Sequence, residues 1–177
     1  SLDEDLRRAV ERGELMLHYQ PVLDLEKLAV KGVEALLRWY HPQRGVVYPR
    51  DFIGLAERNG LTSSISLWVV GQALGELTRW REEGLDLPTL HVNLAGSMLR
   101  ADDWVDRFSE KLYKSGLPAR CLVLEIAESE LLDDEKAVDI LQQLSRLGVG
   151  LAVDDFGTGH SSIARLRDLP FKMIKLD

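Results

Sequence analysis

A regular alternation of short apolar runs and longer amphipathic segments in the second half of the chain is the feature that most limits its possible folds. Strand-like runs alternate with helix-like segments in the order 89–94, 103–115, 121–126, 134–147, 149–153, 161–168 and 171–176. Short buried strands separated by helix-length insertions predict a parallel sheet with right-handed crossovers. Two architectures satisfy this pattern: an open doubly wound sheet and a β/α barrel.

The first half of the chain differs, because two strand-like runs precede any long helix. The runs 15–25 and 28–39 are separated by a short polar turn, which predicts an antiparallel hairpin. Before them, residues 2–14 have the amphipathic spacing of a helix that ends at a glycine, and this helix is consistent with a linker from an upstream domain. Segments 49–58 and 62–83 have helical spacing and follow the hairpin.

Strict alternation along the second run gives Glu34 the same face as Leu28 and Val30. If that face is the interior, a carboxylate points into the core near the end of the strand. A buried acid requires a partner, so Glu34 is a candidate functional residue.

Polar residues at the ends of the predicted strands favour the barrel over the open sheet. These residues are Glu34, Asn93, Glu125, Asp154, Asp155 and Lys175. An open sheet would spread residues from so many strands apart, whereas a closed barrel brings the carboxyl ends of its strands to one mouth, where barrel enzymes have their active sites. We therefore predict an α/β fold, a TIM-type β/α barrel with an antiparallel first strand.

The pair Asp154 and Asp155 follows an apolar run and precedes a turn that contains Gly157 and Gly159. Neighbouring carboxylates repel each other, so a fold that holds two of them at a strand end normally places a cation or a proton between them. A strand end leading into a helix N-cap is the structural alternative, and the pair alone favours a metal site only modestly. The Asp-Phe-Gly triplet also occurs in protein kinases, but the other sequence signatures of that family are missing.

Composition restricts the partners and the compartment. The 177 residues, 45% of them hydrophobic, are enough to bury the core of one globular domain. The net charge of −7 argues against binding along a nucleic-acid polymer. No apolar run has bilayer length and no signal peptide is recognisable, which favours the cytoplasm. The single cysteine, Cys121, is interpreted as a buried thiol, and the four histidines lack metal-ligand spacing and are interpreted as structural or surface residues.

Several short motifs occur in a fixed order along almost the whole chain. They are Tyr19-Gln20-Pro21-Val22, Glu34-Ala35-Leu36-Leu37-Arg38-Trp39, Phe52-Ile53 with Leu55-Ala56-Glu57, Asn93-Leu94, Glu125-Ile126-Ala127-Glu128, Asp154-Asp155-Phe156-Gly157-Thr158-Gly159 and Ile174-Lys175-Leu176-Asp177. The Glu-Ala-Leu triplet or the Asp-Asp-Phe-Gly run would be a weak signal alone, but together, in this order and at these strand ends, they are highly specific. With them, residues 1–177 resemble the EAL domain family, bacterial phosphodiesterases that hydrolyse the second messenger cyclic di-GMP.

The resemblance implies a metal centre. By position, it makes Glu34, Asn93, Glu125 and Asp154 ligands of one divalent ion, with Asp154 or Asp155 also serving a second ion. Oxygen ligands without His or Cys suit Mg²⁺ or Mn²⁺, and two such ions can hold a phosphodiester while one activates the attacking water. Glu34 and Asp155 are thereby expected to be catalytic residues.

The same family pattern assigns roles to further positions. Lys175 matches the lysine that orients the attacking water and stabilises the developing charge. Gln20, Leu36 and Arg38 match positions that contact the ligand, and the planar guanidinium of Arg38 is suited to a phosphate oxygen. Without the motif, Gln20 would be interpreted as a polar strand residue and Arg38 as part of a surface ion pair. Glu128 matches the glutamate that steadies the loop over the acid pair and couples metal binding to dimerisation, with a helix cap as an alternative of similar weight.

The resemblance leaves alternative functions open. A β/α barrel typically needs about 250 residues, so we expect this sequence to stop before the last two strands, which in the family carry a further ligand of the second ion. The leading hypothesis is hydrolysis of cyclic di-GMP to linear pGpG by two-metal-ion catalysis. The alternative is a weak or inactive domain that binds cyclic di-GMP as a regulatory module. The family also implies a homodimer and upstream sensory or GGDEF-type domains in the full protein.

Overall fold

One sheet forms the centre of the molecule, which the computed structural model describes for residues 1–86, 88–131, 135–157 and 166–176. Its strands are β1 (Leu15–Asp24), β2 (Ala29–His41), β3 (Gly45–Val47), β4 (Thr89–Asn93), β5 (Leu122–Ala127), β6 (Gly150–Phe156) and β7 (Met173–Leu176). The path across the sheet is β1-β2-β4-β5-β6-β7, and β3 pairs with β2 off this path. β1 is antiparallel to β2, and every later step along the path is parallel, as the sequence predicted.

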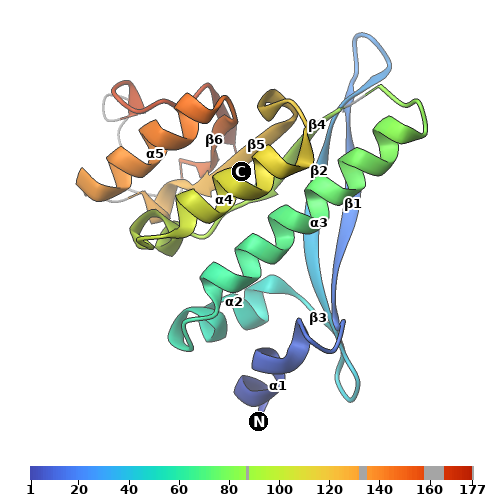
Figure 1. Cartoon of the computed structure of the whole chain (residues 1–177), viewed down its shortest axis with the longest axis vertical. Helices are drawn as coiled ribbons and strands as arrows, with labels where there is room; N and C mark the ends of the chain where they lie inside the picture. Colours follow the sequence, from blue (N-terminus) through green and yellow to red (C-terminus); the bar gives the residue numbers. More distant parts are fainter. Residues whose placement is uncertain (87, 132–134, 158–165, 177) are drawn as a thin grey trace.

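The helices of the described residues pack against one face of this sheet. They are α1 (Leu2–Ala9), α2 (Pro49–Arg58), α3 (Thr62–Glu82), α4 (Trp104–Ser115) and α5 (Glu135–Leu147), with the short 3-10 turns η1 (Gly96–Arg100), η2 (Ala119–Cys121) and η3 (Glu128–Glu130). In Figure 1, α3, α4 and α5 follow one another along the sheet, while α1 and α2 lie near its lower end. None of these helices combines the length and the apolar character that a membrane span requires.

Local sequence explains where several helices begin and end. Pro49 occupies the first turn of α2, where its missing N–H costs no hydrogen bond. Gly116 ends α4 in a left-handed conformation with a φ of +68°, which residues with a side chain rarely adopt. The apolar face of each helix can then pack on the sheet.

The strand register divides the side chains of the sheet between two faces. The face that meets the helices is apolar and almost fully buried, with Val33, Ala35, Leu90, Val92, Leu124, Ile126, Leu151 and Val153. Burying each larger side chain contributes about 1.5–3 kcal/mol, so this face supplies the core. The residues between them in sequence point to the other face, where the predicted polar residues lie.

This arrangement is that of a β/α barrel rather than of a doubly wound sheet. A doubly wound sheet has helices on both faces. Here the strands from β2 onward follow chain order across the sheet, and the described helices cover one face, as in a barrel whose helices form the outer layer. Within the described residues β1 and β7 do not pair with each other, so the sheet remains open.

A β-bulge in the hairpin of β1 and β2 corrects one expectation. Gly32 pairs with Val22, but Val30 pairs with Leu23, so one residue of β2 between them is extra. Neighbouring residues of β1 point to opposite faces, and therefore Gly32 and Val30 do so too. Glu34 shares the face of Gly32 and lies opposite to Val30, contrary to the prediction from strict alternation.

Other differences from the predicted elements are small. The first helix ends at Ala9 rather than near residue 14, and the chain then turns at Gly13 with a φ of +68°. Leu28 has a φ of +51° and lies in the turn before β2 rather than in the strand. The three-residue strand β3 was not predicted. The helix predicted at 161–168 lies mostly outside the described residues.

The helix α1 is attached to the rest of the domain. Leu6 and Ala9 are at most 1% exposed, and Asp5 Oδ2 lies 3.0 Å from His41 Nε2. After the helix, Glu14 Oε2 accepts a 2.9 Å hydrogen bond from Nε1 of the fully buried Trp39. These contacts fix the segment before β1 against β2.

Candidate functional site

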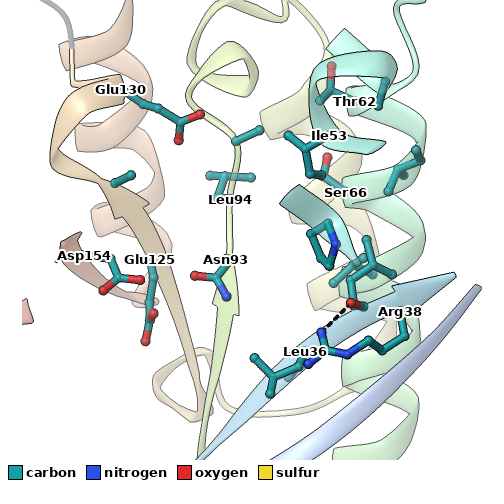
Figure 2. A pocket seen from close by; sticks show the side chains of 18 of the residues that line it. Leu36, Arg38, Ile53, Thr62, Ser66, Asn93, Leu94, Glu125, Glu130 and Asp154 are labelled. Atoms are coloured by element: carbon teal, nitrogen blue, oxygen red, sulfur yellow. Dashed lines mark hydrogen bonds between the residues drawn. The ribbon is translucent and has the colours of Figure 1, made fainter. Parts of the chain in front are cut away.

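The residues that we expected to bind metal lie on the same face of the sheet, opposite to the helices. Asn93 pairs with Glu125 across β4 and β5, and Asp154 of β6 pairs with Ala127, two residues after Glu125 on the same face. Glu34 of β2 pairs with His91, two residues before Asn93. Figure 2 shows Asp154, Glu125 and Asn93 at the ends of neighbouring strands. Four oxygen-bearing side chains therefore share one face and one edge.

Glu34 and Asn93 form the first contact within this set. The amide nitrogen Nδ2 of Asn93 lies 3.4 Å from Glu34 Oε1, which is long for a hydrogen bond. On the other side of Glu34, the exposed Gln20 is its partner across the hairpin and points to the same face. The predicted ligand-contacting residue Gln20 thus lies beside the predicted metal ligand Glu34.

Glu125 is the most buried residue of the set, with 1% of its surface exposed. His91 Nδ1 lies 2.7 Å from Glu125 Oε1, and Lys175 Nζ forms an ion pair with the same oxygen. Burial raises the pKa of the Glu125 carboxyl, but the bonds from His91 and Lys175 outweigh it, so the pKa is lowered from its usual value. Glu125 is therefore a carboxylate, an acceptor, and His91 Nδ1 must donate to it.

The second oxygen of Glu125 is in a different situation. Oε2 is buried and has no hydrogen-bond partner among the described residues. A buried acceptor without a partner costs about 1–3 kcal/mol, and more when it is charged. An orphaned carboxylate oxygen on this face is what a divalent cation would satisfy.

The acid pair at the end of β6 is held in an irregular backbone. Asp154 Oδ1 accepts a 2.9 Å hydrogen bond from the backbone N–H of Asp155, and Asp155 has a φ of +53°. The pairing of β6 with β7 shifts register at this point. Glu128, 1% exposed, accepts a 2.8 Å hydrogen bond from the N–H of Gly157 at its Oε2. Glu128 thus contacts the turn after the acid pair, and its role in steadying that loop stays a prediction.

A pocket of about 280 Å³ opens beside these residues between β2, β4, α2 and α3. Of the predicted site residues, it is lined by Leu36, Arg38, Asn93, Glu125, Asp154 and Asp155. Figure 2 shows the acidic residues at one end, with Ile53, Thr62 and Ser66 toward the other. Gln20, Glu34, Glu128 and Lys175 do not line it.

Arg38 is turned toward its own strand in this structure. Its Nη1 donates a 2.8 Å hydrogen bond to the carbonyl oxygen of Leu37, drawn as a dashed line in Figure 2. The guanidinium carbon lies 4.8 Å from the ring centroid of Tyr48, a cation–π distance. Tyr48 was not identified from the sequence, because it lies outside the motifs.

Glu130 is a further pocket residue that the sequence did not identify. It lines the pocket at the end away from Arg38, as Figure 2 shows. Burial raises the pKa of Glu130, a hydrogen bond involving the backbone of Gly96 opposes this rise, and the nearby charge of Glu57 adds to it. Glu130 therefore adds a carboxyl group to the pocket wall, apart from the acidic residues at the strand ends.

The predicted metal ligands fit a divalent cation by chemistry but are not gathered around one point. The donors are carboxylate and amide oxygens, which suit Mg²⁺ or Mn²⁺, and Glu125 Oε2 is orphaned. In the part of the chain that the structure describes, however, no group of three or more His, Cys, Asp or Glu side chains is close enough to hold a metal ion.

His91 is another residue of the site that was not identified from the sequence. It was interpreted with the other histidines as structural or surface, and it is 7% exposed. The signal that could have identified it is its place two residues before Asn93 in the same strand, which gives both side chains one face.

The chain was compared with known proteins. A family model described as the EAL domain matches residues 3–177. An uncharacterized protein of Mycobacterium tuberculosis is 44% identical over 177 residues, which cover 99% of this chain and 58% of that protein. The bifunctional diguanylate cyclase/cyclic di-GMP phosphodiesterase MucR of Pseudomonas aeruginosa is 41% identical over 174 residues, which cover 98% of this chain and 25% of that protein. This chain thus spans less than two thirds of these relatives.

Solved structures agree with the sequence relatives. The complex of the MucR phosphodiesterase with cyclic di-GMP has a TM-score of 0.92 at 40% identity, covering 98% of this chain and 71% of that one. The FimX EAL domain of Pseudomonas aeruginosa bound to cyclic di-GMP has a TM-score of 0.86 at 26% identity, covering 98% and 70%. A family match over almost the whole chain, with the motif residues on one sheet face, shows that this chain belongs to the EAL domain family.

Proposed function

We propose that this chain is the phosphodiesterase domain that hydrolyses cyclic di-GMP to linear pGpG. The observation that carries the proposal is the common sheet face of Glu34, Asn93, Glu125 and Asp154, with a buried, unpartnered oxygen on Glu125. Relatives named as cyclic di-GMP phosphodiesterases support the substrate. The fit of the donors to a hard cation supports metal-dependent hydrolysis.

Glu34, Asn93, Glu125 and Asp154 are the residues that would hold the first of two divalent ions, and Asp154 or Asp155 would serve the second. Bound there, Mg²⁺ or Mn²⁺ would supply Lewis-acid polarisation of the phosphodiester and lower the pKa of a water molecule. The bonds from His91 and Lys175 lower the pKa of Glu125 and so favour its ionised state. In this proposal, Glu34 and Asp155 are catalytic residues because they help to hold these two ions.

Other residues bind and orient the substrate in this proposal. Arg38 exchanges its bond to the Leu37 carbonyl for a phosphate oxygen, which its planar fork fits better. Gln20 and Leu36 contact the ligand from the same strand pair. Lys175, whose ammonium lies at Glu125, orients the attacking water and stabilises the negative charge that develops on the phosphate.

A second function, binding without efficient hydrolysis, is favoured by one observation. The candidate ligands do not converge in the described residues, and Lys175 is paired directly with Glu125. A domain that keeps this arrangement with ligand bound would hold cyclic di-GMP as a regulatory module.

The proposal extends to the setting of the domain. We propose a cytoplasmic domain that acts as a homodimer within a larger signalling protein with upstream sensory or GGDEF-type domains. The lengths of the relatives support the larger protein, because the matched segment covers 25% of MucR and 22% of the oxygen sensor protein DosP of Escherichia coli. The contact of Glu128 with Gly157 supports its proposed role in steadying the acid-pair loop, and we propose that this loop is coupled to dimerisation.

The proposal is tested with the substitution Glu34→Gln, which keeps the shape of the side chain and removes its charge. The wild-type protein with Mg²⁺ or Mn²⁺ should convert cyclic di-GMP to pGpG. Anion-exchange chromatography separates the two nucleotides and measures the conversion. Glu34→Gln should be slower by roughly 100-fold or more, because the loss concerns electrostatic stabilisation in the transition state. Glu26→Gln, in the exposed hairpin turn, is the matched control and should retain the wild-type rate.

Binding of cyclic di-GMP, measured by calorimetry on the same three proteins, separates the two functions. Tight binding with no pGpG from the wild-type protein would support the regulatory module and reject the phosphodiesterase. Wild-type turnover by Glu34→Gln would reject the role of Glu34.

A further inference from the structure

We propose that His91 is a positioning residue for the metal centre: it holds Glu125 by Oε1 so that Oε2 is left for the cation. The inference rests on the metal centre proposed above and adds a residue to which the family motifs give no role. His91 precedes Asn93 by two residues and lies diagonally below Glu125 on the same face of the sheet. It is an outer partner of a ligand and is not itself a ligand.

The inference rests on the different contacts of the two carboxylate oxygens of Glu125. His91 Nδ1 donates to Oε1 over 2.7 Å, and Lys175 pairs with the same oxygen. Oε2 is equally buried and receives nothing from the described residues. A carboxylate can rotate about its last bond, and a donor fixed to one oxygen removes this freedom. If the Glu125 carboxylate is already fixed before the cation binds, binding does not include the entropic cost of ordering that side chain.

The imidazole is suited to this role because packing fixes its ring. His91 is 7% exposed, and Gly32, which lies on β2 two residues before its strand partner Glu34, has no side chain beside the ring. A Cβ at Gly32 would lie 3.0 Å from the carbonyl oxygen of Thr89 and 3.4 Å from His91 Nε2. Gly32 therefore leaves the space that the ring occupies. The lysine partner, by contrast, has a long flexible side chain that is 27% exposed.

Removing the His91 donor should weaken the binding of metal. Without His91, Oε1 is held by Lys175 alone, and the carboxylate can rotate with the ammonium group. Outer partners of metal ligands typically contribute a factor of about 10–100 to metal affinity. We expect a loss of this size in affinity for Mn²⁺, without the loss of a ligand.

Two substitutions separate the hydrogen bond from the packing. In His91→Asn the amide Nδ2 is bonded to Cγ as Nδ1 is in histidine, so a donor can occupy the same place. His91→Leu has a comparable size and no donor. Val123→Ala is the packing control, because Val123 pairs with His91 in the neighbouring strand and has no polar group. Affinity for Mn²⁺ is measured without substrate, by electron paramagnetic resonance of the free ion.

The expected result is that His91→Leu weakens Mn²⁺ binding about 10–100-fold, while His91→Asn and Val123→Ala stay within about threefold of wild type. Equal losses in the Leu and Asn variants, or no loss in either, would overturn the inference. If the Leu variant does not fold, His91→Ala compared with Val123→Ala provides the same contrast between a lost donor and a cavity. If hydrolysis is absent but Mn²⁺ affinity follows this pattern, only the proposed reaction fails, whereas wild-type protein that binds no Mn²⁺ overturns the centre and the inference together.

Discussion

Replacing Glu128 with alanine should release the turn that follows the acid pair. Glu128 is 1% exposed, and its Oε2 accepts the N–H of Gly157 over 2.8 Å. Gly157 has a φ of +98° and comes two residues after Asp155, whose φ is +53°. Backbone in these regions is held by its surroundings, because non-glycine residues adopt such angles at a cost of about 1–3 kcal/mol. The Glu128 carboxylate is one such restraint.

The size of the effect follows from the type of bond. A hydrogen bond to a charged group contributes about 1.5–3 kcal/mol, whereas a neutral one contributes about 0.5–1.5 kcal/mol. Because 1.4 kcal/mol corresponds to a factor of ten, Glu128→Ala should lower the protection of the Gly157 amide against hydrogen exchange roughly 10–100-fold. Glu128→Gln keeps an acceptor of the same shape and should lie between alanine and wild type.

Amide hydrogen exchange followed by NMR measures this directly. The control is Ser129→Ala, which changes an exposed neighbour in the same 3-10 turn. Amides in α3, such as that of Val70 in the core, report global unfolding and should exchange as in wild type if the effect is local. Unchanged protection of Gly157 in Glu128→Ala would refute the restraint, and equal loss at Val70 would show a global rather than a local effect.

Two further predictions concern stability. Gly96→Ala should destabilise the domain by about 1–3 kcal/mol in urea unfolding, because its Cβ would lie 2.6 Å from Glu130 Cβ. A Cβ at Gly75, an exposed position of α3, would meet nothing within 4 Å, so Gly75→Ala should be neutral or stabilising. A hydrogen bond with His41 lowers the pKa of Asp5, so its stabilisation is present above the usual aspartate pKa of about 3.9 and is lost as the pH falls through the lowered value. The difference in urea midpoint between wild type and Asp5→Asn should therefore be present at pH 5 and shrink below pH 4, and a difference that grows with acid would contradict this assignment.

The order of strands and helices was predictable because its signals are local. Apolar runs, helical spacing and stop residues such as Gly116 act within a few residues of the chain, and they determine where β4, β5 and α4 begin and end. The bulge in the first hairpin was not predictable in this way. It depends on which residue of β1 faces Val30 across the strands, and single-strand alternation carries no information about the partner.

The sequence was sufficient to predict which edge of the sheet carries the candidate site. The carboxyl ends of parallel strands meet at one edge, so residues at strand ends come together whatever the details of packing. The individual contacts were not predictable. The bond of His91 to Glu125 joins residues 34 positions apart, and the approach of Gly96 to Glu130 joins two turns, so both depend on the assembled sheet.

The two faces of the strands explain how one short segment can serve stability and chemistry together. In β5, Leu124 is fully buried on the helix side, and its neighbour Glu125 points to the opposite face with a charge that must be desolvated. Desolvating a carboxylate costs several kcal/mol, and the bonds from His91 and Lys175 compensate at one oxygen only. The apolar face therefore supports a polar face that includes an unpartnered carboxylate oxygen, and a cation bound there, as we propose, would satisfy Oε2. On this account metal binding should couple to stability, because any ion that binds the folded site and not the unfolded chain adds its binding free energy to folding.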